Sequence, residues 1–285
     1  MKKSFESVTG GVRDAALVYH SFMGIIDHAR GCLKPFFAAL VCLVIAGCDM
    51  FDLDATRVVA GTVIRSPSIP APEGGLAQSE VTAASAFVGD DEYGLLVPPV
   101  GVIGADVHLT IFAQGESVRD VQLFGLGDGN YTVTSVEDPD LVYMSGASYR
   151  LEVEELGDLY EVDVGQAPTP EAPQGLADGH RSGEPLTVTR SQMYIAFLEV
   201  LRLEGGGATQ TWTNRPSGIQ ETLDVLFDPS PYQASSFDIP GEAFPQPGQY
   251  AIVLITGDLG EPDINLHPGS NIVVGAGEAR IISVE

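Results

Sequence analysis

Lysine and cysteine are nearly absent from this 285-residue sequence. All three lysines lie within the first 34 residues, and two of the three cysteines precede Cys48. A chain that begins at Cys48 therefore forms no internal disulfide and no cysteine-ligated zinc site. It has nine basic and 36 acidic residues, a net charge of −27, against −25 for the whole sequence. This charge excludes nucleic acid and anionic lipid headgroups as partners, because such partners need clustered basic side chains.

A long hydrophobic run is also missing. The longest, residues 36–47, has 12 residues, whereas a membrane-spanning helix needs about 20. The run follows Arg30 and Lys34 and ends at Cys48, which is the order of charge, apolar core and cleavage site in a secretory signal peptide. Residues 1–47 are therefore predicted to be a cleaved signal peptide. Met23 is an alternative start that gives a leader of ordinary length.

The end of this leader has a recognisable motif, formed by Ile45, Ala46, Gly47 and Cys48. It resembles the lipobox of bacterial lipoproteins. The resemblance implies cleavage before Cys48, acylation of Cys48, and an anchor in the lipid bilayer of the bacterial cell envelope. Two or three acyl chains make such an anchor lasting. Residues 48–55 would be the acylated cysteine and a short tether.

The membrane that holds the anchor is less well defined by the sequence. Asp49 follows the acylated position, and in enteric bacteria an aspartate there resembles a signal for retention in the inner membrane. Other bacterial lineages sort lipoproteins differently, so Asp49 does not decide the membrane. The prediction favours the outer membrane or the cell surface over the inner membrane.

Glycine and proline are abundant, with 33 and 19 residues, which favours short strands and turns over long helices. The predicted fold class is all-β, with two tandem β-sandwich domains of immunoglobulin-like type. The domains are expected at 56–164 and 184–285, because the Pro- and Gly-rich stretch 165–183 reads as a semi-rigid linker between two strand-rich blocks.

The clearest strand pattern in the first block is residues 148–164. Apolar and charged residues alternate on both sides of Leu156-Gly157-Asp158, which predicts a hairpin with one buried face and one acidic face in water. Further strands of the first block are expected at 57–64, 81–88, 107–113, 118–124 and 131–136.

In the second block, the run 249–255 is apolar at every position after Gln249 and so on both faces, which predicts a central strand covered from both sides. Residues 193–204 fit a strand or a short helix, and strand is the prediction. The remaining strands are expected at 186–189, 210–213, 222–228, 237–239 and 271–284.

Two resemblances support a sandwich. Residues 59–63, 104–107 and 128–133 look like the first strand, a later strand and a turn of carboxypeptidase-regulatory-like, transthyretin-like domains. Tyr149 and Tyr250 each follow a glycine turn at a strand start, which resembles the tyrosine corner of immunoglobulin-like sandwiches. The tyrosine corner implies that each phenol hydroxyl bonds back to upstream backbone.

Motifs for catalysis are missing. The histidines at 108, 180 and 267 are far apart in sequence and form no metal-binding pattern. There is no nucleophile elbow and no phosphate loop, because the glycines at 125–129 precede a strand and lack the lysine that a phosphate loop needs. The protein is therefore predicted not to be an enzyme.

Two groups of residues are candidates for binding. Trp212 and Arg215 are types enriched at contact hot spots, although a Trp packed inside a sandwich explains Trp212 more simply. Calcium is the one cofactor that the sequence leaves open, because loops concentrate oxygen donors without matching an EF-hand. The weak candidates for calcium are Asp90, Asp91, Glu92, Asp128 and Asn130.

The predicted function is a lipid-anchored envelope lipoprotein, which serves as a non-catalytic structural or binding module for a protein or glycan. One alternative is a polysaccharide or peptidoglycan hydrolase that uses two loop carboxylates in an aromatic-lined cleft. Another is a spacer stiffened by calcium.

Overall fold

Strands dominate the part of the chain that the computed structural model describes. The described residues are 55–91, 99–177, 179–216, 221, 225, 228–263, 265–267 and 269–285. They belong to one compact unit, Phe51–Glu285. The all-β prediction is confirmed. The predicted signal peptide, the motif ending at Cys48 and nearly all of the tether lie outside the described residues, so their roles stay predictions.

The described residues of the first block form ten strands. They are β1 (Arg57–Ser66), β2 (Ile69–Pro70), β3 (Leu76–Gln78), β4 (Val81–Asp90), β5 (Val100–Gly101), β6 (Asp106–Ala113), β7 (Glu116–Gly127), β8 (Asn130–Thr134), β9 (Ser148–Glu155) and β10 (Asp158–Val164).

In the second block, the named elements among the described residues are seven strands and two short 3₁₀ helices. They are β11 (Leu186–Thr189), β12 (Ile195–Glu204), β13 (Gly207–Thr213), η1 (Ser230–Tyr232), β14 (Ser236–Ile239), η2 (Gly241–Ala243), β15 (Gly248–Leu259), β16 (Glu261–Pro262) and β17 (Asn271–Val284).

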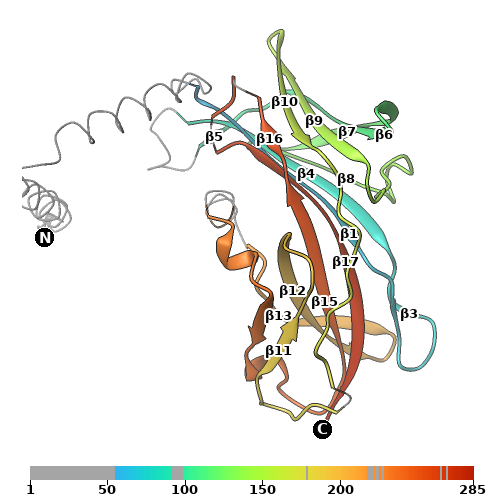
Figure 1. Ribbon diagram of the computed structural model, residues 1–285. Helices are drawn as coiled ribbons and strands as arrows, with labels where there is room; N and C mark the ends of the chain where they lie inside the picture. The colour runs from blue at the N-terminus through green and yellow to red at the C-terminus, as the bar shows by residue number, and fades with distance from the viewer. Residues whose placement is uncertain are drawn as a thin grey trace, which may run out of the picture. The chain divides into compact units, whose positions relative to one another are not determined.

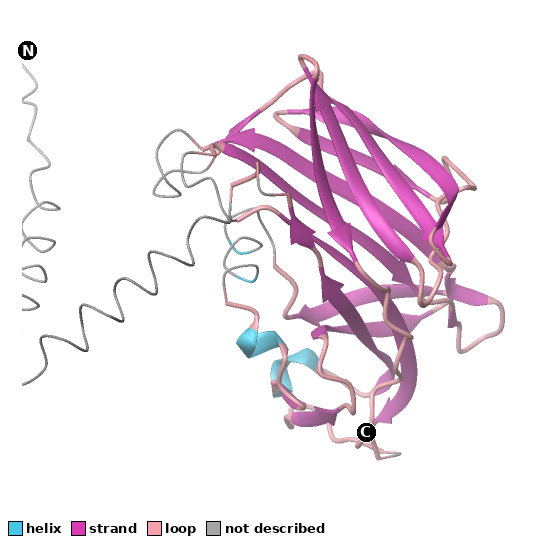
Figure 2. Ribbon diagram, turned by 45° about the horizontal axis from the view of Figure 1, so that its top comes forward, coloured by secondary structure: helices cyan, strands magenta, loops and turns pink. Residues whose placement is uncertain are grey.

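One large mixed sheet runs through both blocks, in the order β13-β12-β15-β17-β1-β4-β8-β7-β6-β9-β10-β16, with β5 on β4. It folds over itself because β7 pairs with β6 through Leu123 and with β8 from Phe124 onward. The resulting sandwich-like arrangement encloses a core that includes Val63 of β1, Leu109 of β6 and Leu151 of β9. Figure 2 shows the two strand layers of this part.

The strands β12, β15 and β17 form a layer whose two faces are both buried. Val200 and Ile252 belong to a cluster that the small β11–β14 sheet covers, whereas Leu201 and Val253 face the β2–β3 hairpin side. Every residue from Tyr250 to Gly257 is buried. The predicted central strand, covered on both faces, is therefore confirmed, and Figure 1 shows β15 between its neighbours.

The two predicted blocks share this sheet. Six residues of β1, from Ala60 to Arg65, pair in parallel with β17 at the other end of the sequence. Ile272 and Val274 of β17 also lie in the core of the first block. The described residues thus do not form two separate sandwiches. β17, from the second block, pairs with β1 and belongs to the same sheet as the first block.

Residues 165–183, predicted as a linker, pack against both blocks. Gln174 exchanges two backbone hydrogen bonds with Thr189, of 2.9 and 3.0 Å. The buried Glu171 accepts hydrogen bonds from the backbone and hydroxyl of Ser191 and from the backbone of Gln192, at 2.6–3.1 Å. Burial alone raises the pKa of Glu171, but these hydrogen bonds outweigh it, so the pKa falls below its usual range.

Several local predictions can be compared with the structure directly. Residues 195–204 are strand, as predicted, and the hairpin at 148–164 buries its apolar face. Tyr149 donates a hydrogen bond to Val142 O (3.0 Å), and Tyr250 donates one to Gln246 O (2.8 Å), so both phenol hydroxyls bond to upstream backbone as predicted. The strand expected at 222–228 is wrong at Val225, which is helical, and most of that range lies outside the described residues.

Candidate functional site

The two outer faces of the sandwich-like part differ in chemistry. We call the outer face of β6, β7, β9 and β10 the acidic face. Its outward side chains include Asp106, His108, Asp120, Arg150, Glu152, Glu154, Glu161 and Asp163. Six carboxylates thus share one arginine and one histidine, as expected where a strand alternates apolar and acidic residues.

Arg150 offsets part of this charge. Its guanidinium lies 2.8 Å from Glu161 Oε1 and 2.7 Å from Asp163 Oδ1, and it covers the ring of Phe112. Hydrogen bonds and charge from Asp163 raise the pKa of Arg150 despite partial burial. The guanidinium therefore stays charged and holds β9 and β10 together.

His108 bridges two carboxylates on the same face. Its Nδ1 lies 3.0 Å from Asp120 Oδ1, and its Nε2 lies 3.1 Å from Asp106 Oδ1. An ionised carboxylate only accepts hydrogen bonds, so both contacts form at once only when both ring nitrogens carry protons. Burial lowers the pKa of His108, but Asp120 and Asp106 together raise it above its usual value.

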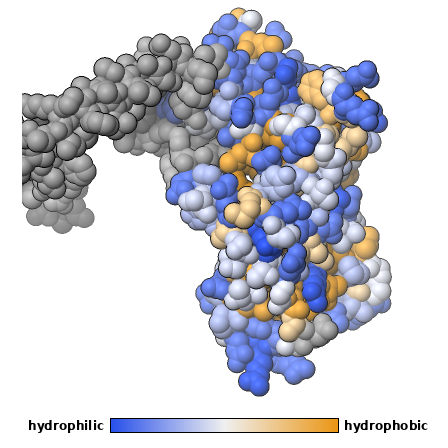
Figure 3. Space-filling view, viewed as in Figure 1, coloured by the Kyte–Doolittle hydropathy of each residue, from blue (hydrophilic) through white to orange (hydrophobic). Residues whose placement is uncertain are grey.

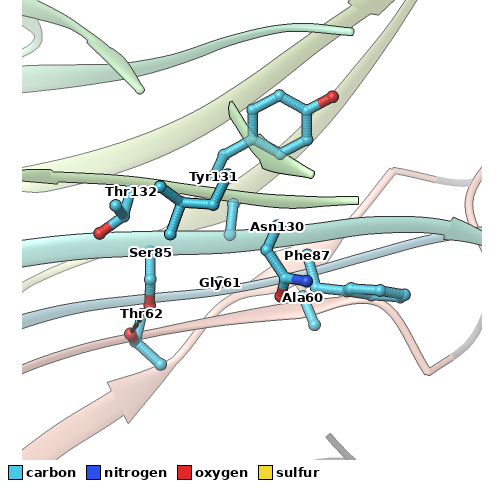
Figure 4. A pocket seen from close by; sticks show the side chains of 10 residues that line it. Ala60, Gly61, Thr62, Ser85, Phe87, Asn130, Tyr131 and Thr132 are labelled. Carbon is cyan, nitrogen blue, oxygen red and sulfur yellow. Dashed lines mark hydrogen bonds between the residues drawn. The ribbon is translucent and has the colours of Figure 1, made fainter. Parts of the chain in front are cut away.

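The opposite outer face, on β1, β4 and β8, carries small and uncharged side chains. We call it the neutral face. It contains a hollow of about 310 Å³, lined by Ala60, Gly61, Thr62, Ser85, Ala86, Phe87, Leu126, Asn130, Tyr131 and Thr132. Figure 4 shows this hollow from close by. None of its lining residues is Asp, Glu, His, Cys, Lys or Arg, so the lining offers hydrogen bonds and apolar contact.

The polar groups of the hollow are held by the sheet. Thr62 and Ser85, directly paired on β1 and β4, share a hydrogen bond of 2.8 Å between their hydroxyls. The hydroxyl of Thr132 donates to Ala84 O at 3.0 Å. The alternation of strand side chains places these three hydroxyls on one face, and this face is the wall of the hollow.

Two aromatic residues of the hollow, Phe87 and Tyr131, point in different directions. Phe87 lies over Gly89, where an added Cβ would come within 2.6 Å of the ring. Tyr131 points to the other side of the sheet from Phe87 and Asn130, as Figure 4 shows. Its hydroxyl accepts from Ala105 N (3.0 Å) and donates to Val102 O (3.2 Å), so it is occupied in the core.

The neutral face continues toward the second block. A smaller hollow of about 80 Å³ shares Thr62 with the first and is also lined by Phe197 and Arg215. A third, of about 550 Å³, lies beyond Arg215 and includes Asp228. Asp228 Oδ1 accepts hydrogen bonds from the backbone and hydroxyl of Ser230.

The structure does not bring the predicted pair Trp212 and Arg215 together. Trp212 packs half-buried against the cluster that contains Val200. Arg215 lines the hollow beside Phe197 on the opposite face of β12, and its Nη1 lies 2.6 Å from Glu199 Oε1. Trp212 pairs with Val200 within β13, whereas Arg215 lies beyond the end of that strand at Thr213.

The described candidate calcium ligands lie at or next to the ends of β4 and β8, and the side chains of three of them make other contacts. Asp90 lies 3.5 Å from Arg57, and the buried Asp91 lies 3.6 Å from His267 Nε2. Asn130 donates to the backbone oxygens of Gly127 and Asp128. Glu92 is outside the described residues. Within the described part of the chain, no three His, Cys, Asp or Glu side chains group as metal ligands, and calcium stays a prediction.

Other loop carboxylates, on which the hydrolase alternative depends, are likewise engaged. Glu137 accepts hydrogen bonds of 2.9 Å from the backbone and hydroxyl of Thr134. Asp140 lies 3.0 Å from Arg119 Nε, and Glu155 lies 2.5 Å from Arg57 Nη2. The hydrolase alternative stays a prediction.

Sequence reasoning missed the hollow, because its polar residues are ordinary serines and threonines on three strands that lie far apart in sequence. The only signal is that β1 and β4 carry small or hydroxyl residues where an exposed strand face usually carries charge, as at Ala60, Thr62 and Ser85.

Fold and site together define an all-β, sandwich-like protein with an uncharged hollow on one face. No family model matches the chain, and no curated protein matches its sequence. Among the residues that the structure describes, none forms a helix with the length and apolar character needed to cross a membrane.

Proposed function

We propose that the protein is a bacterial envelope lipoprotein, anchored through acylated Cys48, whose neutral face binds a protein or glycan partner without catalysing a reaction. The observation that carries the binding role is the hollow, about 310 Å³ in volume and lined by hydroxyls, an amide and the apolar Phe87 and Leu126. Ligand sites combine apolar surface with a few placed polar groups in this way.

The anchor is supported by the sequence alone. A basic segment, an apolar run of 12 residues and the motif Ile45–Cys48 occur in the order that lipoprotein processing needs. The outer membrane or the cell surface is the favoured location.

The finer assignment of the fold is also a proposal. We infer a relationship to immunoglobulin-like and transthyretin-like sandwiches, with the blocks 56–164 and 184–285 as the evolutionary modules. The hydrogen bonds of Tyr149 and Tyr250 to upstream backbone support it, because this feature is typical of immunoglobulin-like domains.

The binding role can be tested by crosslinking in living cells. The photoreactive residue benzoylphenylalanine replaces Ser85 in the hollow and, as a matched control, Asp120 on the acidic face. We expect a discrete crosslinked product at position 85 that disappears when Thr132→Arg is added, and no such product at 120. Equal products at both positions, or none at 85, would contradict the proposal.

The anchor has its own test. Cells are grown with an alkyne-bearing fatty acid, and label is compared between the native protein and Cys48→Ser. Label that depends on Cys48 is expected. A mature amino terminus without acyl groups in mass spectrometry would refute the anchor and leave the crosslinking result standing.

A further inference from the structure

One end of the sandwich-like part exposes apolar side chains. We call it the tether end, because β1 begins there. Three more strands end here, namely β4, β7 and β9, and four others begin here, namely β6, β8, β10 and β17. The turns at 127–130 and 155–158 and the strand β5 therefore lie together at this end. Its large apolar side chains that are more than half exposed are Val100, Ile103, Leu126, Leu156 and Leu159.

Leu156 is the most exposed of them, with 99% of its surface accessible. It occupies the β9–β10 turn with a φ of +54°, and Gly157 follows with +95°. A turn with two positive φ values favours Asn-Gly, and leucine at the first position is strained. Leu156 therefore adds no side-chain packing to the fold and strains its backbone, which suggests a contact outside the molecule.

The path of the chain places this end beside the proposed anchor. Glu155, next to Leu156, forms an ion pair with Arg57, the third described residue. The seven peptide units from Cys48 to Ala55 extend at most about 25 Å, whatever their conformation. A chain acylated at Cys48 consequently holds the tether end within that distance of the bilayer. Figure 1 shows β5 and the start of β1 at this end, and Figure 3 shows apolar surface among hydrophilic residues at the top of the view.

We propose that the tether end rests on the bilayer, with Leu156 inserted among the lipids as the leading contact. The inference rests on the proposed acylation of Cys48. Glu154 and Asp158 flank the turn, and the chain after residue 47 has a net charge of −27, so the contact suits a zwitterionic surface and weakens on an anionic one. The tether supplies a high local concentration, and a few exposed leucines are then enough to orient the molecule.

The test uses the acylated protein in vesicles of phosphatidylcholine. Once Cys48 is acylated, residues 48–285 have no other cysteine, so Leu156→Cys can be labelled alone with the polarity-sensitive dye NBD. Val136→Cys is the matched control, since Val136 is also highly exposed but follows β8 at the opposite end. We expect the dye at 156 to emit at shorter wavelength and to be quenched by nitroxide-bearing lipids. The dye at 136 should do neither.

Two further samples sharpen the test. Leu156→Cys combined with Cys48→Ser should lose the shift, and vesicles that contain phosphatidylglycerol should reduce it. If the protein is acylated and floats with the vesicles, yet the dye at 156 behaves like the dye at 136, the inference is wrong and the anchor stands. The dye at 156 could also be shielded from water in native envelopes but not in vesicles of pure lipid. That result would show that Leu156 contacts a protein partner, and it would overturn the inference of lipid contact. Absence of the acyl chain would instead refute the proposed function.

Discussion

The acidic face and the neutral face cover the same core and yet present opposite chemistry. On β9 the outward residues are Arg150, Glu152 and Glu154, whereas on β4 they are Ala83, Ser85 and Phe87. Removing water from several carboxylates is costly unless each gains a partner, whereas removing it from methyl and ring groups is favourable, and removing it from a hydroxyl costs less when the hydroxyl keeps a hydrogen bond. The difference teaches that the acidic face is suited to remain in solvent, and the neutral face is suited to contact.

The two faces also differ in how they are held. Arg150 and His108 offset part of the charge on the acidic face, so its stability depends on salt and pH. The neutral face depends on close strand contacts and short hydroxyl hydrogen bonds, which salt does not screen. The four predictions below test this contrast, beginning with the largest expected effect.

Gly275→Ala should lower the free energy of unfolding by about 2 kcal/mol, because overpacking a closed site forces backbone to move. A Cβ on Gly275 would lie 2.5 Å from Thr256 O, at the margin where β17 continues the neutral face. Urea denaturation measures the loss. Gly207→Ala, where the nearest atom would be 3.7 Å away, is the control and should change stability by less than about 0.5 kcal/mol. Equal losses would contradict the packing argument.

Arg150→Gln should lower stability by about 1 kcal/mol at low ionic strength, because Glu161 and Asp163 then face each other without a cation. Salt screens this repulsion, so most of the loss should vanish at about 1 M NaCl. Thr62→Ala on the neutral face removes the hydrogen bond to Ser85, and its smaller loss should be the same at both salt concentrations. A salt-independent loss for Arg150→Gln would show that charge does not govern the acidic face.

Asp120→Asn should lower the pKa of His108, which the carboxylates of Asp120 and Asp106 raise above its usual value. Because the pKa of His108 is raised on folding, its contribution to stability is complete below the unfolded pKa of about 6.5 and is lost as pH rises through the folded value. NMR titration of the imidazole protons follows the shift. Asp238→Asn, on the separate β11–β14 sheet, should leave the titration of His108 unchanged, and an unchanged midpoint in Asp120→Asn would refute the bridge.

Leu126→Ser should have the smallest effect on stability, within about 0.5 kcal/mol, because 72% of Leu126 is exposed. It removes apolar surface from the wall of the hollow, so the crosslink formed at position 85 should nevertheless weaken. Leu159→Ser is the matched control, since Leu159 is also more than half exposed but lies opposite Glu154 on the other face. If the crosslink weakens equally in both variants, binding does not depend on the neutral face.

Much of the local structure could be predicted from the sequence. The hairpin at 148–164 follows from strict alternation, the buried strand β15 follows from its continuous apolar run, and Tyr149 and Tyr250 follow from their glycine turns. Each of these signals is local, because the period of a strand and the geometry of a turn are properties of a few consecutive residues. Val225 escaped this reasoning because alternation over a few residues also fits a helical turn.

The candidate site could not be predicted in the same way. Thr62, Ser85 and Thr132 form one wall only because β1, β4 and β8 are neighbours in register. The buried Glu171 appears in the sequence as one acidic residue among prolines, and its partners at 190–192 are identified only by the fold.

The sequence by itself determined where most of the long strands lie, that one hairpin face must be acidic, and that a leader ending before Cys48 is predicted to precede a chain without lysine. Only the tertiary structure decided that β1 pairs with β17, that Trp212 and Arg215 point apart, and that exposed leucines gather beside the tether. The reason is physical: side-chain alternation acts over neighbouring residues, whereas strand order and register depend on which distant surfaces exclude water best when they meet.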